Sequence, residues 1–167
     1  MSVTKTQTGI VEPVKDTHPL YIVCQKNFNV WLDSLTEAQQ NWVRETAMPA
    51  KAGTCITLPN IDGHIGGAAL LTDKNLIWES AGAASRLPSG SWAPELTFSE
   101  AASLGDIQLG WGLAQYHFAP HRPDKDPDNK AQLALAKRDQ DRGVEAQVRG
   151  IHIAREMINQ PANKMTP

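Results

Sequence analysis

The residues of this 167-residue chain that suggest chemistry include one glycine-rich stretch, Gly63-His64-Ile65-Gly66-Gly67. Glycines let backbone N–H groups approach an anion closely, so this stretch is the candidate for cradling a phosphate. It lies inside an expected β-hairpin, however, and opens no helix, so the helix N-terminus on which a phosphate loop depends is missing. We therefore expect a turn followed by a bulged strand here.

Two histidines have a spacing that suggests zinc. His117 and His121 are four residues apart, which would place both rings on one face of a helix. Pro120 breaks that helix between them, and no glutamate lies between them to act as a general base. We do not assign a metal site to this pair.

A run of aspartates, Asp124, Asp126 and Asp128, alternates in the manner of a calcium-binding loop. Such a loop also needs a glycine and a closing glutamate, and both are absent here, while Pro127 interrupts the run. A solvated run of charges in a surface loop over residues 120–129 is the better interpretation.

The nucleophiles needed for covalent catalysis are also missing. Cys24 and Cys55 both lie in apolar stretches expected to be strands, and burial there raises a thiol pKa rather than lowering it. Two such cysteines do not suggest a disulfide scaffold, and no Gly-x-Ser-x-Gly elbow occurs. We therefore assign no catalytic, cofactor-binding or metal-ligating residue to this chain.

The composition predicts one ordinary globular domain with its own core, since 41% of the residues are hydrophobic and 20% are charged. The net charge of -2 arises from 16 basic and 18 acidic residues spread along the chain, so neither nucleic acid nor a membrane is an expected partner. The first eight residues lack the apolar core of a signal peptide, and no apolar run approaches the ~20 residues needed to span a bilayer. We expect a cytoplasmic protein.

The elements that must carry these residues alternate between strands and helices. A capping box, Thr36 with Gln39, announces one of the helices. The order implies an α/β domain with a mixed β-sheet flanked by helices on both faces, and the hairpin makes part of that sheet antiparallel. The expected strands cover 20–24, 54–58, 64–72, 91–96 and 131–136. Three expected helices cover 28–35, 36–47 and 75–87. A fourth helix is capped by Ser99 or Asp106 and ends near Phe118, and a fifth is opened by Asp139 or Asp141 and ends before Pro161.

Two of these helices are apolar on more sides than a surface helix needs. The helix around Gly110 and Gly112 should be sandwiched between neighbours, because each glycine inside a helix costs about 1 kcal/mol and suggests close backbone approach. On the final helix, Val144, Val148, Ile151 and Ile158 form a stripe suited to the sheet of the domain. Its polar stripe consists of Glu145, Arg149, His152 and Glu156.

A further apolar arc on the final helix, formed by Ala146, Gly150, Ile153 and Met157, has no partner in this scheme. Two explanations remain open: a loop of the same domain covers the arc, or a second domain does. Arg155 projects near the main stripe, and we expect its stem to lie along apolar surface while its guanidinium reaches water or helix carbonyls. An interdomain ion pair is the alternative.

The last two residues, Thr166 and Pro167, form an N-cap followed by a proline at the first helical position, which is how helices begin. We therefore expect the chain to be the front part of a longer protein. The run from Ala154 to Pro167 closely resembles the segment that joins the two domains of the leucyl aminopeptidase (cytosol aminopeptidase) family. The stretches from Gly110 to Phe118 and from Leu87 to Trp92 resemble two further motifs of that family.

The resemblance implies a protein of two domains. Residues 1–19 would be a polar leader, 20–138 an N-terminal α/β domain similar to the macro-domain fold, 139–160 a final helix leading to the catalytic domain, and 161–167 the interdomain linker. The absent catalytic domain would hold two divalent metals, zinc or manganese, and remove N-terminal amino acids from peptides, usually as a hexamer.

None of the family's metal-ligand motifs occurs in this chain, so the chain is expected to be inactive alone, to have its own catalytic domain as partner, and to act in packing and assembly. The alternative is a macro-like module that binds a small ligand such as ADP-ribose or a nucleotide. The sequence gives neither the substrate preference nor the metal of the parent protein.

Overall fold

The computed structural model describes residues 8–99, 101–117 and 130–159, and these form a six-stranded sheet of order β1-β6-β5-β2-β4-β3. All neighbouring strands are parallel except the antiparallel pair β3 and β4. The predicted mixed α/β sheet is confirmed. The strands are β1 Ile10–Val11, β2 His18–Cys24, β3 Cys55–Pro59, β4 Ile65–Thr72, β5 Gly90–Phe98 and β6 Ala131–Ala134.

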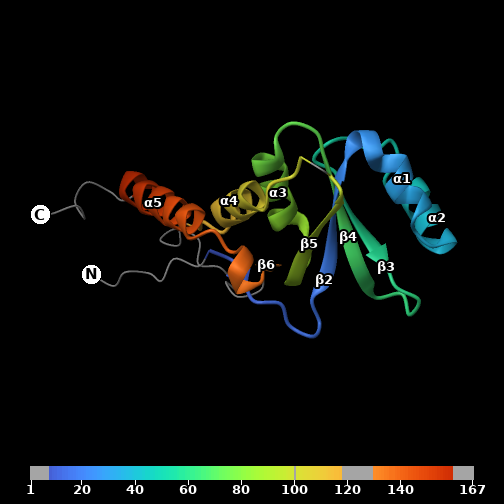
Figure 1. The fold of residues 1–167 in the computed structure, drawn as a ribbon, viewed down its shortest axis with the longest axis horizontal. Coiled ribbons are helices and arrows are strands. Elements are labelled where there is room, and N and C mark those ends of the chain that lie inside the picture. The colour runs from blue at the N-terminus through green and yellow to red at the C-terminus, as the bar shows by residue number, and fades with distance from the viewer. Residues whose placement is uncertain (1–7, 100, 118–129, 160–167) are drawn as a thin grey trace, which may run out of the picture.

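Helices cover both faces of the sheet, as predicted. In Figure 1, α1 and α2 lie on one side of the strands, α3 and α4 lie on the other, and α5 lies beyond α4. The helices are α1 Phe28–Asp33, α2 Glu37–Thr46, α3 Leu76–Arg86, α4 Leu104–Ala114 and α5 Arg142–Asn159.

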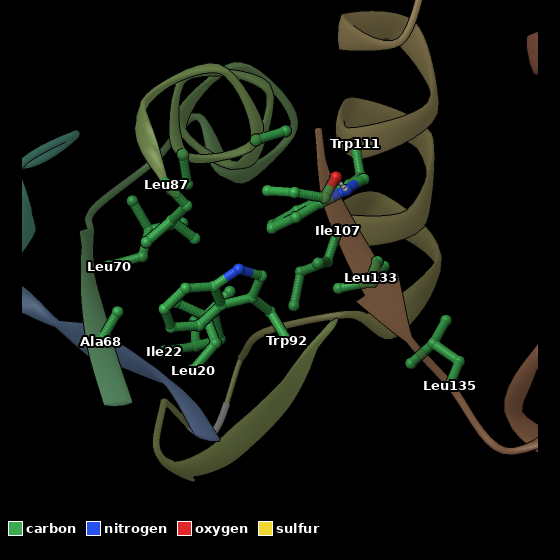
Figure 2. Packing of buried hydrophobic residues seen from close by; sticks show 13 residues of the cluster. Leu20, Ile22, Ala68, Leu70, Leu87, Trp92, Ile107, Trp111, Leu133 and Leu135 are labelled. Carbon is green, nitrogen blue, oxygen red and sulfur yellow. Dashed lines mark hydrogen bonds between the residues drawn. The ribbon is translucent and has the colours of Figure 1, made fainter. Parts of the chain in front are cut away.

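The two faces of the sheet build two separate cores. Strands β2 and β4 are nearly continuous apolar runs because both of their faces are covered. Leu20 and Ile22 of β2 face the core under α3 and α4, while Val23 faces the core under α1 and α2. Figure 2 shows the first core, in which Trp92 and Trp111 lie among aliphatic side chains from the strands and both helices.

The helix starts follow from side-chain caps. The predicted capping box is present: the Thr36 hydroxyl accepts from the Gln39 backbone N–H, and the Gln39 side chain accepts from the Thr36 N–H. Helix α4 is capped by Ser103, not by Ser99 or Asp106, and Asp106 supplies the backbone N–H that the cap accepts. It ends at Ala114 rather than near Phe118, a residue that lies outside the described part of the chain.

The final helix begins after Asp141, one of the two predicted openings. The Asp141 carboxylate accepts the backbone N–H groups of Gly143 and Val144, at 2.7 and 3.2 Å. Because these N–H groups have no partner within the helix, the carboxylate stabilises its first turn.

The segment expected as a polar leader contributes to the sheet. Ile10 and Val11 form β1 beside β6, with Leu133 N donating to Gly9 O and Leu135 N to Val11 O. The central strand β2 also starts at His18, two residues before the predicted Leu20. A two-residue strand shows no alternation in the sequence, so nothing local announces β1.

The glycine-rich stretch is the turn and irregular strand that the sequence predicts. Gly63 has a φ of 77°, and the Asn60 side chain accepts the backbone N–H groups of Asp62 and His64. The register of the hairpin shifts between Leu58 and Pro59. The stretch therefore closes a hairpin and opens no helix.

Helix α2 protects the exposed edge of the sheet. Strand β3 is the last in the order, and Trp42 Nε1 and Gln39 Nε2 donate to the outward carbonyls of Thr57 and Pro59, each at 3.0 Å. Pro59 itself has no backbone N–H to offer. The two side-chain donors occupy carbonyls of β3, and Pro59 lacks a backbone donor, so another strand would find fewer hydrogen-bonding partners along this edge.

We predict that Trp111→Phe destabilises the domain more than Trp31→Phe. Trp111 Nε1 donates to Ala131 O at 3.1 Å, whereas the buried indole N–H of Trp31 has no hydrogen-bond partner among the described residues. Both indoles are fully buried, so the change in volume is matched. The difference in free energy of unfolding, measured with urea, should be about 1–2 kcal/mol. Equal losses would contradict the assignment of this hydrogen bond.

Candidate interdomain surface

Helix α4 lies between α3 and α5 because two of its positions lack side chains. A Cβ at Gly110 would collide with the Ile77 carbonyl oxygen and the Ser80 hydroxyl of α3. A Cβ at Gly112 would come within 2.7 Å of a Val148 methyl group of α5. The predicted sandwich is therefore confirmed, with one glycine for each neighbouring helix.

Helix α5 is turned differently from the prediction. Its buried residues are Val148 and His152, and Val148 fits against Gly112 of α4. The expected packing of the Ile151 and Ile158 stripe on the sheet is wrong, since these side chains are 37% and 82% exposed. The placement of His152 on a solvent-facing polar stripe is also wrong, since it is 6% exposed.

A group of polar contacts around Tyr116 explains this orientation. We call Tyr116, His152, Arg155, Glu156 and Asn159 the Tyr116 clamp. The Tyr116 hydroxyl donates to Glu156 Oε2 at 3.4 Å and accepts from Asn159 Nδ2 at 3.0 Å. The clamp ties the second half of α5 to the segment that follows α4.

The Arg155 guanidinium reaches a carbonyl at the C-terminal end of α4. This is the predicted contact with helix carbonyls. Its Nη1 donates to Leu113 O at 3.3 Å, and its guanidinium carbon lies 5.6 Å from the centre of the Tyr116 ring. A cation at a helix C-terminus interacts favourably with the helix dipole, and a cation over an aromatic face is attracted by the ring. Arg155 therefore holds α5 against α4.

His152 is the buried titratable group of the clamp. Its ring lies 5.3 Å from that of Tyr116, and its Nε2 has no hydrogen-bond partner among the described residues. Burial lowers the pKa of His152 below 6.5, the Arg155 charge lowers it further, and a hydrogen bond to the Gly112 carbonyl opposes the shift. Burial therefore favours the neutral form of the ring in the folded domain.

The side of α5 opposite the clamp is apolar and exposed. Ile153 is 57% and Met157 is 55% exposed, and the neighbouring small residues are exposed as well. The predicted ion pair on the flank is present, with Arg149 Nη2 at 2.6 Å from Glu145 Oε1. We call this side the outward face, and it consists of Ala146, Gly150, Ile151, Ile153, Ala154, Met157 and Ile158.

The outward face is the candidate interaction site of the domain, because large exposed apolar patches on proteins mark such sites. The predicted arc of Ala146, Gly150, Ile153 and Met157 is part of it, and Ile151 and Ile158 extend it. No residue in the described ranges buries the large side chains of this face. Figure 1 shows that α5 is the outermost helix on its side of the domain.

The other residues singled out in the sequence do not converge on a site. His117 lies on the exposed segment after α4, whereas His121 and the aspartates Asp124, Asp126 and Asp128 fall outside the described residues. Within the described ranges, no three histidine, cysteine, aspartate or glutamate side chains are grouped to hold a metal ion. None of the described helices has the length and apolarity to cross a membrane.

The two cysteines are free thiols in strands, as predicted, with Cys24 the last residue of β2 and Cys55 the first of β3. Burial raises the pKa of Cys55 to about 11, and the nearby Arg86 charge lowers it only in part. A thiol with this pKa is protonated at neutral pH and is a poor nucleophile. Cys55 therefore has a structural role beside β4.

Sequence reasoning missed the Tyr116 clamp because its members come from two segments some forty residues apart, which no local pattern connects. A histidine on a stripe with Glu145 and Arg149 looks solvent-facing when only the helix itself is considered. The one available signal was that the helix is apolar on more sides than the domain itself can cover.

We predict that the domain loses stability as the pH falls below about 6.5, partly through His152. A histidine whose folded pKa is depressed takes up a proton more readily when unfolded, so its contribution is complete above the unfolded pKa and declines as the pH decreases. Urea unfolding of His152→Gln between pH 7.5 and 5.5 should show a shallower pH dependence than the original chain. His64→Gln, in the exposed hairpin turn, is the control and should retain the original slope. An unchanged slope in His152→Gln would contradict the prediction.

Comparison with known proteins identifies the domain. The family model described as M17 aminopeptidase, N-terminal domain, matches residues 18–136. The cytosol aminopeptidase from Coxiella burnetii superposes with a TM-score of 0.83 at 24% identity, over 96% of this chain and 35% of that one. No curated protein sequence matches the chain.

Two structures of the bottromycin maturation enzyme BotP match less closely. One has a TM-score of 0.59 and covers 90% of this chain and 34% of BotP. The other, in complex with Mn, has a TM-score of 0.62 and covers 89% and 33%, and both are 16% identical. The chain thus spans about a third of the length of these enzymes. Since the family model covers most of the described α/β domain, the chain belongs to the M17 aminopeptidase N-terminal domain family.

Proposed function

We propose that this chain is the non-catalytic part of a metal-dependent leucyl aminopeptidase, and that it packs on the catalytic domain through the outward face of α5. The observation that carries the proposal is the exposure of Ile153, Met157 and Ile158 on the last helix of the described domain. Covering this face would stabilise the association of the two domains by roughly 25 cal/mol for each Å² of apolar surface removed from water.

The chemistry of the parent protein belongs to its other domain in this proposal. That domain would hold two divalent metals, zinc or manganese, and hydrolyse the first peptide bond of peptide substrates. The Mn complex of BotP supports a role for a divalent metal in relatives that share this fold. We propose a cytoplasmic hexamer for the parent, in which the present chain helps to shape assembly.

The proposed organisation keeps the boundaries expected from the sequence. The α/β domain over 20–138 precedes the final helix and linker over 139–160 and 161–167, and the catalytic domain follows. The family model, which matches residues 18–136, supports the separation of the α/β domain from the final helix. The one changed boundary is that of the leader: its described part, residues 8–19, belongs with the α/β domain, because β1 pairs with β6 and β2 begins at His18.

The macro-like binding alternative has no support. No protein matched above is described as a binder of ADP-ribose or nucleotides. In open α/β sheets, ligands bind at the carboxyl ends of strands where the connections diverge. At that position between β2 and β5, Asn27 Nδ2 donates to Phe98 O at 3.1 Å and joins the two strand ends.

The first test concerns activity. The purified 167-residue chain should not turn over a leucyl anilide in the presence of Mn²⁺, while the full-length parent should. Turnover by the isolated chain would refute its assignment as non-catalytic.

The second test concerns the outward face. Ile153→Lys should leave the stability of the 167-residue chain within about 0.5 kcal/mol, because the side chain is exposed. In the full-length protein it should accelerate amide hydrogen exchange in α5 and lower the melting temperature. Val30→Lys is the matched control, since Val30 is a 63% exposed aliphatic residue of α1 on the other side of the domain. Equal behaviour of the two variants in the full-length protein would refute docking through α5.

A further inference from the structure

A glycine in the middle of α5 lacks the explanation that holds for the glycines of α4. Glycine inside a helix costs about 1 kcal/mol relative to alanine. Gly110 and Gly112 offset this cost because α3 and α5 occupy the space where their side chains would be. At Gly150, a built Cβ meets nothing within 4 Å. The domain itself therefore gives no reason for a glycine at this position.

Gly150 lies at the centre of the outward face. Ala146 and Ala154 are four residues before and after it, so the three small residues follow one another along the helix surface. Larger side chains border this strip, with Ile153 and Met157 on one side and Ile151 on the other, while Ile158 continues the strip beyond Ala154. At 100° per residue, Gln147 is the one polar residue within this half of the helix circumference.

We propose that a helix of the catalytic domain crosses α5 at Gly150 and approaches it closely enough to fill the space of the missing side chain. This proposal rests on the proposed function and names the contact within it. A helix fits because a strip of small residues between larger ones forms a groove into which a ridge of side chains on a partner helix can pack. Gly110 and Gly112 show the same device inside the domain, where α4 meets its two neighbours.

The occupant is the catalytic domain of the same chain rather than a second copy. The matched family is an N-terminal domain, and this chain corresponds to 35% of the Coxiella enzyme. Helix α5 is the last described element of the chain and follows the residues that the N-terminal family model matches. Polypeptide tethered there has a high effective concentration at the face, whereas a second copy loses translational and rotational freedom on binding.

The test asks whether Gly150→Ala stabilises α5 in the 167-residue chain and destabilises it in the full-length protein. In the 167-residue chain, Gly150→Ala should raise the melting temperature by roughly 2–4 °C, because alanine favours the helix and nothing obstructs its methyl group. In the full-length protein the same change should accelerate amide exchange in α5 several-fold, and Gly150→Leu should do so more strongly.

Gly82→Ala is the matched control. Gly82 is an interior glycine of α3 whose built Cβ meets only the flexible Arg86 side chain, at 3.9 Å. This variant should be stabilised in both forms of the protein. Gly110→Ala should instead destabilise both forms, because the added methyl group would meet the α3 backbone.

The outcomes separate the two proposals. If Gly150→Ala stabilises both forms as Gly82→Ala does, while Ile153→Lys still loosens the full-length protein, the close helix crossing is wrong and docking through α5 stands. If neither variant affects the full-length protein, both proposals fail. If the 167-residue chain dimerises in sedimentation experiments, Gly150→Leu abolishes the dimer, and the full-length protein is unaffected, the occupant is a second copy and the proposal is overturned.

Discussion

The stacking of α3, α4 and α5 depends on two missing side chains. Gly110 lets α4 approach the Ile77 carbonyl of α3, and Gly112 lets Val148 of α5 approach α4. Any larger residue at Gly110 would push α4 away from α3, and Trp111 would then lose its buried hydrogen bond to Ala131 O in β6. The close contact between α3 and α4 at Gly110 thus also fixes the attachment of α4 to the sheet.

The same stacking determines where α5 presents its surfaces. Val148 seated against Gly112 fixes the position of the helix, and the Tyr116 clamp fixes its rotation. With these two points held, Ile153 and Met157 necessarily point away from the domain. The exposure of the outward face is therefore a consequence of a glycine on a different helix, Gly112 of α4.

Much of the fold could be predicted from local sequence patterns. Apolar runs identified the central strands, the Thr36 capping box identified the start of α2, and Asn60 with Gly63 accounts for the hairpin turn. These features depend on residues close together in the chain. β1 escaped prediction because its two residues are ordered by pairing with β6, more than a hundred residues away.

The candidate site was only half predictable for a similar reason. The wheel of α5 showed too much apolar surface, but it could not tell which apolar arc the domain buries, because that depends on the shape of α4. It also assigned His152 to solvent, whereas Tyr116 and the Gly112 carbonyl give the ring a buried place. Contacts between distant segments, rather than helix periodicity, decide the rotation of α5.

The polarity of α5 is the reverse of that of an ordinary surface helix. Such a helix buries its apolar stripe and exposes its polar one. Here the domain-facing side carries His152, Arg155 and Glu156 beside Val148, while Ile153, Met157 and Ile158 are the most exposed large hydrophobic side chains of the helix. Polar contacts satisfy hydrogen bonds and fix direction, but they contribute little net stability. The strongly apolar side is thus the one available to the proposed partner, and the polar contacts on the opposite side set the direction in which it faces.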